Sequence, residues 1–130
     1  MIDYEVKIFN RVHSAVADLC APKKFVSAQI VSPTDLPAGS LIEMDNATVT
    51  GRQSTSLVEN FARITYQLDI FGRSKSECRK VYAAADEAMI GMNFNRISGH
   101  YIDNPGHPGV FRYTARYEAE IDPGGNLYRP

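Results

Sequence analysis

The chain lacks the features that would mark it as a disulfide scaffold or a nucleic-acid-binding domain. It has no tryptophan and only two cysteines, and its 14 Lys and Arg residues nearly balance 15 Asp and Glu residues. A net charge of −1 supplies no basic field to attract DNA or RNA. Cys20 and Cys78 each fall on the apolar side of a predicted helix. This placement favours buried free thiols over a disulfide or a ligand role, and it fits a reducing compartment.

Long hydrophobic runs are missing too. No apolar stretch approaches the ~20 residues that a membrane-spanning helix needs. The first twenty residues, MIDYEVKIFNRVHSAVADLC, have no basic lead followed by an apolar core, so we do not interpret them as a secretory signal. We therefore expect no membrane association and synthesis in the cytoplasm. A chain of 130 residues, 44 % of them hydrophobic, is the size of one domain that can bury its own core, so we expect a single domain over residues 1–130.

The N-terminal region has the spacing of an amphipathic helix. Apolar side chains recur in steps of three and four residues between Asp3 and Cys20, with Asp3 as the N-cap and Pro22 after the end. The predicted buried stripe comprises Ile2, Val6, Phe9, Val12, Val16 and Leu19.

The middle of the chain has weaker signals. Phe25–Val31 is a short strand candidate, and Leu41–Met44 is another without clear limits. Asp45–Ser56 is small and polar, so it cannot offset its ordering entropy by burial. We interpret residues 45–56 as a long mobile loop or an extended arm.

The second half has stronger patterns. Arg63–Phe71 alternates between polar and apolar residues, and Ser74 with Glu77 forms a capping box before an amphipathic helix. Phe94–Ile102 is a further strand, and Asn126–Pro130 is expected to be exposed, within an exposed tail over 123–130. The last strand, Val110–Ile121, has the clearest alternation. Its apolar set is Phe111, Tyr113, Ala115, Tyr117, Ala119 and Ile121, and its polar set is Arg112, Thr114, Arg116, Glu118 and Glu120.

This order of elements predicts an α+β single domain. A strand–helix–strand crossover followed by a hairpin gives a mixed, mostly antiparallel sheet of about four to five strands. The N-terminal helix and the second helix are expected to pack on one face of that sheet. The other face carries charge without a catalytic cluster, which points to a surface used for assembly.

Few residues form a constellation suited to chemistry. His100, His107 and Asp103 would resemble a three-ligand metal site across the final hairpin, but exposed imidazoles beside a turn are the default interpretation. Ser74 follows a strand as some nucleophiles do, yet its capping role accounts for it. Glu118 and Glu120 share a strand face as paired carboxylates would, although a solvated or interface face is more common. We predict no catalytic residue, no cofactor and no metal. The chain's numerous arginines fit a subunit interface and an ordinary solvated surface equally well.

The segment ITYQLDIFGRSKSECRKVYAAADEAM, residues 64–89, resembles the central block of tail-terminator (tail-completion) proteins of long-tailed, siphovirus-type bacteriophages. In that family a strand ending like Leu68–Phe71 meets a Ser-rich helix start. A short strand with an aromatic residue and an arginine follows, here Phe94 and Arg96, and then an Arg-Tyr strand, here Arg116 and Tyr117. The resemblance covers the second half well and the first half only by layout.

The resemblance implies a structural virion protein rather than an enzyme. Family membership would make the chain one protomer of a homo-oligomeric ring, typically a hexamer, that ends polymerisation of the tail tube at its head-proximal end. Its partners would be sister copies, the tail tube protein and the head connector or neck protein, with double-stranded DNA passing through the lumen without sequence recognition. Its location would be the virion tail, with the host cytoplasm during assembly. The candidate interface residues are Thr48, Val49, Thr50, Arg52, Arg112, Arg116, Glu118 and Glu120.

Two other classes remain open. Neck, head-closure and minor tail proteins of similar size share this layout. A ferredoxin-like domain that binds a small molecule, or an enzyme of that type, is also compatible with the strand–helix–strand half, since a fold alone does not assign a function. A pocket with converging polar groups would favour the small-molecule alternative, and a flat charged face with extended arms would favour assembly.

Overall fold

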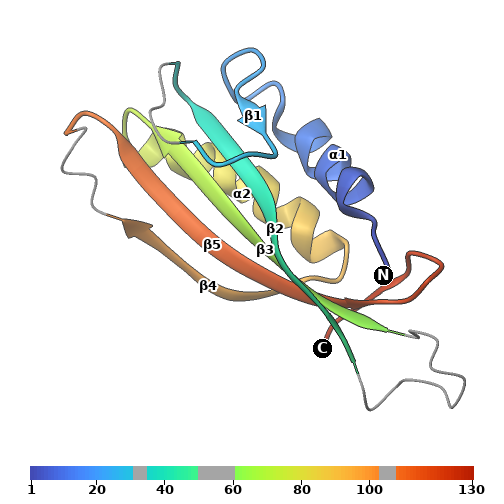
Figure 1. Cartoon of the computed structure of the whole chain (residues 1–130). Helices are drawn as coiled ribbons and strands as arrows, with labels where there is room; N and C mark the ends of the chain where they lie inside the picture. Colours follow the sequence, from blue (N-terminus) through green and yellow to red (C-terminus); the bar gives the residue numbers. More distant parts are fainter. Residues whose placement is uncertain (31–34, 50–60, 103–107) are drawn as a thin grey trace, which may run out of the picture.

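The computed structural model describes residues 1–30, 35–49, 61–102 and 108–130. In these segments, one sheet is covered on one face by two helices (Figure 1). The helices are α1 (Glu5–Val16) and α2 (Lys75–Gly91). The strands are β1 (Phe25–Val26), β2 (Ala38–Thr48), β3 (Ala62–Gly72), β4 (Asn95–Ile102), β5 (Phe111–Ile121) and β6 (Leu127–Tyr128).

The strand order is β1-β2-β3-β5-β4, and β6 pairs with the end of β5. Only β1 and β2 are parallel neighbours; the other described pairs are antiparallel. Because β5 pairs antiparallel with both β3 and β4, the β3–α2–β4 unit crosses over β5. The predicted α+β class and the mixed, mostly antiparallel sheet are confirmed, with six strands instead of four or five.

Helix α1 packs with most of the predicted stripe, since Ile2, Val12 and Val16 are buried, but Ile8 takes the place of Val6. Its buried residues are Ile8, Val12 and Val16, one row of four-residue steps, while Val6 is 73 % exposed. Phe9 stacks on Phe25 of β1, with ring centroids 5.6 Å apart. The prediction was wrong in phase for Val6, which lies two residues before Ile8 and so points to the far side of the helix. It was also wrong for Leu19, which lies beyond the end of α1 and is exposed.

Helix α2 begins where its capping signal predicts. The Glu77 backbone N–H donates to Ser74 Oγ at 3.1 Å. The Glu77 carboxylate accepts the backbone N–H of Arg73, one residue before the cap, at 3.0 Å. The predicted stripe is buried at Cys78, Val81, Ala85 and Met89.

The core lies between the helices and the inner face of β3 and β5. Tyr66, Leu68 and Ile70 of β3 and the alternate residues of β5 from Tyr113 to Ile121 are buried there. The predicted inward set of β5 is confirmed except at Phe111, the first residue of β5, which is 38 % exposed. In the predicted outward set, Thr114 and Glu120 are also buried.

Three segments differ in part from the prediction. Residues 45–56 were expected to form a long loop or an extended arm, and Asp45–Thr48 fit the extended arm, because they continue β2 and pair with Ala62–Thr65 of β3. The strand candidate Phe25–Val31 is a strand only over Phe25–Val26, and residues 31–34 lie outside the described residues. The C-terminal tail is mostly exposed, as predicted, but its Leu127–Tyr128 form β6.

Candidate functional site

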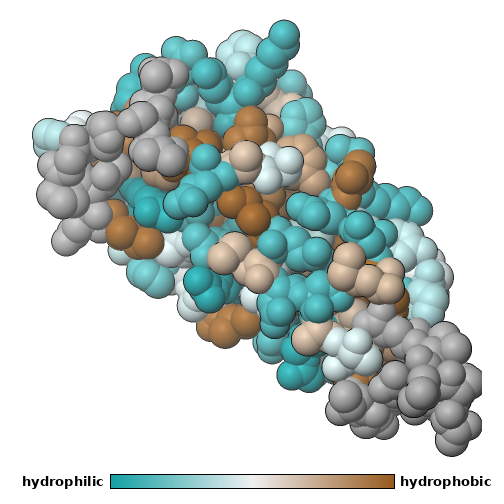
Figure 2. Space-filling model, viewed as in Figure 1, coloured by the Kyte–Doolittle hydropathy of each residue, from teal (hydrophilic) through white to brown (hydrophobic). Residues whose placement is uncertain are grey.

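The predicted interface charges of β5 lie on the outer face of the sheet, away from the helices. Figure 2 shows this side of the molecule, where hydrophilic residues predominate and separate smaller hydrophobic patches. Arg112 is held in place here: its Nη2 and Nε lie 3.0 Å and 3.2 Å from Asp69 Oδ1. Gln67 donates to Asp69 Oδ2 at 2.9 Å, and Asp69 is only 3 % exposed. Arg112 therefore neutralises a buried carboxylate of its own chain.

Glu120 is engaged in the same way. Its Oε2 lies 3.2 Å from Nη2 of Arg63 on the neighbouring strand β3, and the Glu120 side chain is mostly buried. The alternative interpretation of Glu118 and Glu120 as paired reactive carboxylates, less favoured than a solvated or interface face, has no support from this arrangement, because Glu120 is already paired with a cation.

Arg116 and Glu118 are the more accessible of the predicted charges. Arg116 is exposed and Glu118 is half-buried. In the sheet, Arg116 lies between Gln67 of β3 and Ser98 of β4, and Glu118 lies between Thr65 and Asn95. These two side chains offer opposite charges on one face, a pattern suited to contact with another protein surface.

Two further predicted interface residues, Thr48 and Val49, lie at the far end of β2. Thr48 is the last residue of β2 and is exposed, and the Val49 backbone N–H donates to the Phe61 carbonyl at 2.9 Å. The β2–β3 ladder therefore continues one step past the strand. Thr50 and Arg52 lie outside the described residues.

Strand β4 is an open edge of the sheet that the sequence did not single out. Asn95–His100 are all exposed, and the part of the chain that the structure describes places no strand on the side of β4 away from β5. The register shifts between Arg96 and Ser98, so Ile97 is the extra residue of a bulge and is 51 % exposed. Unpaired backbone on such an edge is available to another strand.

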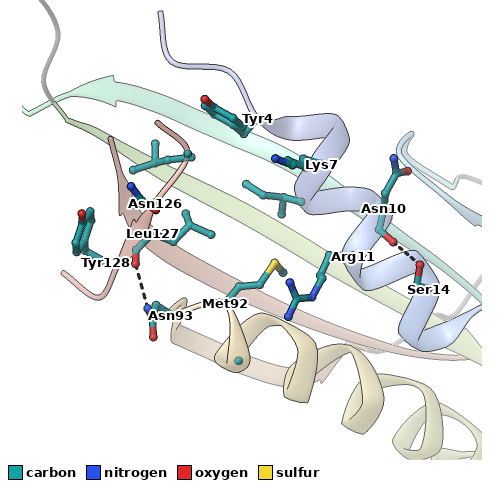
Figure 3. A pocket seen from close by; sticks show the side chains of 14 residues that line it. Tyr4, Lys7, Asn10, Arg11, Ser14, Met92, Asn93, Asn126, Leu127 and Tyr128 are labelled. Carbon is teal, nitrogen blue, oxygen red and sulfur yellow. Dashed lines mark hydrogen bonds between the residues drawn. The ribbon is translucent and has the colours of Figure 1, made fainter. Parts of the chain in front are cut away.

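An open groove of about 780 Å³ lies on the helix-covered side of the sheet, between α1, the end of α2 and the C-terminal turn (Figure 3). We call it the α1–C-terminal groove. Ile8 and Ile121 form its apolar floor with Met92 and Leu127. Lys7 and Arg11 extend into it from α1, and its lining contains no acidic side chain among the described residues. No sequence pattern indicated this groove, because its walls come from three distant segments.

An acidic cluster lies elsewhere near the start of α1. Carboxylate oxygens of Asp3, Glu5 and Glu43 lie within 4.8 Å of one another. Burial raises the pKa of Glu43, the neighbouring Glu5 and Asp3 raise it further, and a hydrogen bond of 3.2 Å from the Tyr66 phenol opposes the shift. Such a cluster alone does not define a metal site.

The described residues assemble no nucleophile with a base. Burial raises the pKa of both Cys20 and Cys78 to about 11, and both are free thiols. Ser74 is the N-cap of α2. His13 lies beside the Phe9 ring in α1, and His100 is exposed on β4. The alternative of a metal site at His100, His107 and Asp103 falls outside the described residues, because 103–107 are not among them.

No protein-family model matches the chain, and no curated protein matches it significantly. Neither described helix combines the length and the apolar character that crossing a membrane requires.

Proposed function

We propose that this chain is a structural protein of virion assembly, of the tail-terminator type. In this proposal it forms a ring, expected to be a hexamer, at the head-proximal end of a phage tail tube. The ring ends tube polymerisation and presents the surface that the head connector or neck protein joins, while double-stranded DNA passes through its lumen. The protein has no enzymatic role in this account. Its location is the virion tail, reached from the host cytoplasm.

The observation that carries the proposal is the open edge of the sheet at β4. No described strand pairs with the outer side of β4, and the sequence provides neither proline nor lysine there. Arg96 and the bulge at Ile97 are the features that limit pairing along this edge. At the other end of the sheet, β1 pairs with β2 only at Gly39 and Ser40. Within the described residues, the side of β2 away from β3 therefore has no strand neighbour from Leu41 onward. Two different edges on one protomer suit head-to-tail contacts, which form a ring when the rotation from one protomer to the next closes.

The β2–β3 ribbon gives further support. In Figure 1 the far ends of β2 and β3 extend beyond the helices, and Asp45, Ala47 and Thr48 of β2 are exposed there. In the proposed ring this ribbon, with the 45–56 segment that begins in it, contacts the neighbouring protomer or the tube. Arg116 and Glu118 are the outer-face charges proposed to face a partner.

The α1–C-terminal groove is the specific observation that favours the alternative, a ferredoxin-like domain that binds a small molecule. Its titratable lining residues are Lys7, Arg11, Tyr4 and Tyr128, and no histidine, cysteine or carboxylate of the described residues lines it. This set suits binding better than acid–base catalysis. Neck, head-closure and minor tail proteins remain alternatives within the assembly class.

The proposal is tested by placing a charge on the β4 edge. Ile97→Lys should shift the assembled protein toward monomer in light scattering across a concentration series, because an edge lysine opposes strand pairing. Ala83→Lys is the matched control, since Ala83 is exposed on α2. Unchanged assembly by Ile97→Lys, with both variants folded by circular dichroism, would contradict the role of β4.

A further inference from the structure

We propose that the α1–C-terminal groove is a docking site for an acidic peptide segment of a partner protein, with an apolar side chain as its anchor. This inference goes beyond the proposed ring and does not depend on it. It rests on the shape of the groove, on the contacts that hold its walls, and on two cations that form no ion pair among the described residues.

The floor of the groove is apolar and continuous with the core. Ile8 and Ile121 are 4 % and 1 % exposed, and both belong to the main hydrophobic cluster. Met92 and Leu127 pack against that cluster while remaining partly accessible from the groove. A side chain placed here would remove apolar surface from water on both partners, at roughly 25 cal/mol per Å².

The walls are preformed by hydrogen bonds between distant segments. The Tyr4 phenol donates to the Pro123 carbonyl at 2.7 Å, and Asn93 Nδ2 donates to the Leu127 carbonyl at 3.0 Å. Arg129 Nη2 donates to the Ile90 carbonyl near the end of α2 at 3.0 Å. These bonds tie α1 and α2 to the C-terminal turn, so a ligand would enter without ordering the groove first.

The turn itself is fixed by close packing. Gly125 has φ +85°, and a Cβ at this position would lie 2.8 Å from the Tyr4 ring. Only glycine combines this backbone conformation with this approach. The Asp122 carboxylate, in the same turn, accepts the Asn126 backbone N–H at 2.9 Å and the Tyr128 phenol at 3.1 Å. Both carboxylate oxygens of Asp122 therefore accept hydrogen bonds from within the turn.

The lining of the groove has two cationic side chains and no acidic one among the described residues. Lys7 and Arg11 are exposed and lie four residues apart on α1, about one helical turn. Among the described residues neither forms an ion pair; Lys7 Nζ lies only over the Tyr4 ring, 5.9 Å from its centroid. The carboxamides of Asn93 and Asn126 are used in the contacts that hold the turn. The cations are therefore the main groups available to an incoming ligand.

This combination fits an acidic peptide better than the other anions. A single phosphate would pair with the cations but leave the apolar floor in water. A nucleic acid requires a broader basic surface, whereas Asp3 and Glu5 lie at the start of α1 and the whole chain has a net charge of −1. Carboxylates flanking an apolar anchor match both the cation row and the floor.

The absence of tryptophan from the chain provides a direct assay. The probe is the peptide Glu-Glu-Trp-Leu-Glu-Glu, blocked at both ends, whose indole is then the only one in the sample. We expect a saturable blue shift of its emission as the full-length protein is added, weakening with salt. The peptide Lys-Lys-Trp-Leu-Lys-Lys should not bind.

Charge variants locate the binding. The double variant Lys7→Glu with Arg11→Glu should weaken binding at least about tenfold, because two attractive contacts become repulsive. Lys80→Glu, on the exposed side of α2, should leave it unchanged. Asn10→Lys adds a third cation to the same helix and should tighten binding several-fold, a gain that unfolding cannot mimic.

Three outcomes overturn the inference. The first is no saturable binding of the acidic peptide, and the second is equal binding of both peptides. The third is competition by inorganic phosphate or by a DNA duplex at lower concentrations than the peptide requires, which would assign the groove to those anions. Binding of the peptide by a protein that never assembles would leave the inference intact and count against the ring alone.

Discussion

The Tyr117 phenol of β5 donates a hydrogen bond of 2.6 Å to Asp86 Oδ1 of α2. Arg96 of β4 lies 3.3 Å from the same carboxylate oxygen. One carboxylate thus links the helix to two adjacent strands across the inner face. Burial raises the pKa of Tyr117, and the neighbouring Asp86 raises it further, so the phenol remains a donor at all ordinary pH values.

Removing the Tyr117 hydroxyl should weaken the attachment of α2 to the sheet. Tyr117→Phe keeps the ring but loses the bond, and we expect the free energy of unfolding to fall by about 1–2 kcal/mol. Urea denaturation measures the change. Tyr101→Phe is the matched control, because its phenol makes only a long contact of 3.4 Å to the Lys75 carbonyl. An equal loss of unfolding free energy in the two variants would show that the hydrogen bond to Asp86 stabilises the fold no more than the Tyr101 contact does.

Gly99 of β4 leaves room for the Tyr113 phenol. A Cβ at Gly99 would collide with the Tyr113 hydroxyl, and the Tyr113 ring is held in place by stacking on Tyr82 with centroids 4.0 Å apart. We expect Gly99→Ala to destabilise the fold by about 1–3 kcal/mol. Removal of the hydroxyl in Gly99→Ala with Tyr113→Phe should recover part of that loss, as a double-mutant cycle would measure.

A second glycine provides the control for this prediction. Gly91 is the last residue of α2, and a Cβ added there would have no neighbouring atom of the described residues within 4 Å. Gly91→Ala should therefore be neutral or stabilising by up to about 1 kcal/mol. A loss at Gly91 as large as that at Gly99 would contradict the steric explanation.

Glu43 should make stability depend on pH. Its folded-state pKa is raised above the ordinary value of 4.5, mainly by burial. The folded chain therefore holds this proton more tightly than the unfolded chain does. The resulting stability is fully present below pH 4.5 and is lost as the pH rises through the folded-state pKa.

The variant Glu43→Gln tests this dependence, because glutamine resembles the protonated carboxyl. It should be more stable than the wild type at pH 7 and equal to it at pH values well below 4.5, as measured by thermal unfolding in a pH series. Glu87→Gln, exposed on α2, should show no such pH-dependent gain. A pH-independent offset for Glu43→Gln would argue for a packing effect instead.

Arg112 should contribute to the stability of the fold through its ion pair with Asp69. Arg112→Met leaves the Asp69 carboxylate, 3 % exposed, without its cation, and we expect a loss of about 1–3 kcal/mol. Adding Asp69→Asn should recover much of it. Arg63→Met likewise removes the cation beside Glu120, whose side chain is 9 % exposed, so we expect a loss of similar size. Chemical denaturation of the wild type and these variants measures the contribution of each pair.

Local patterns predicted β3, α2 and β5 well. The inner residues of β3 and β5 alternate because the sheet has one covered face, and Ser74 marks the start of α2 through its own backbone contact. These signals act within one element, so the sequence alone contains them.

The errors came from contacts between distant segments. Asp45–Thr48 is polar and has no strand signal of its own; it is a strand because β3 offers pairing partners. Tyr128 and Leu127 form β6 for the same reason, beside the end of β5. The phase of α1 follows from its packing on the sheet, where Ile8 rather than Val6 faces inward.

The candidate sites were equally hard to predict. The charges of Arg112 and Glu120 looked available for a partner, but cross-strand neighbours already pair with them. The open edge at β4 depends on strand order, and the α1–C-terminal groove depends on three segments meeting. Both features are formed by residues far apart in the sequence, so no local pattern predicts them.

The central claim is that copies of this chain assemble through their sheet edges, and native mass spectrometry of the wild-type protein across a concentration series tests it most directly. The account predicts that one closed oligomer, expected to be a hexamer, replaces the monomer as the concentration rises. A chain that stays monomeric throughout the series and instead retains a small-molecule ligand would contradict it.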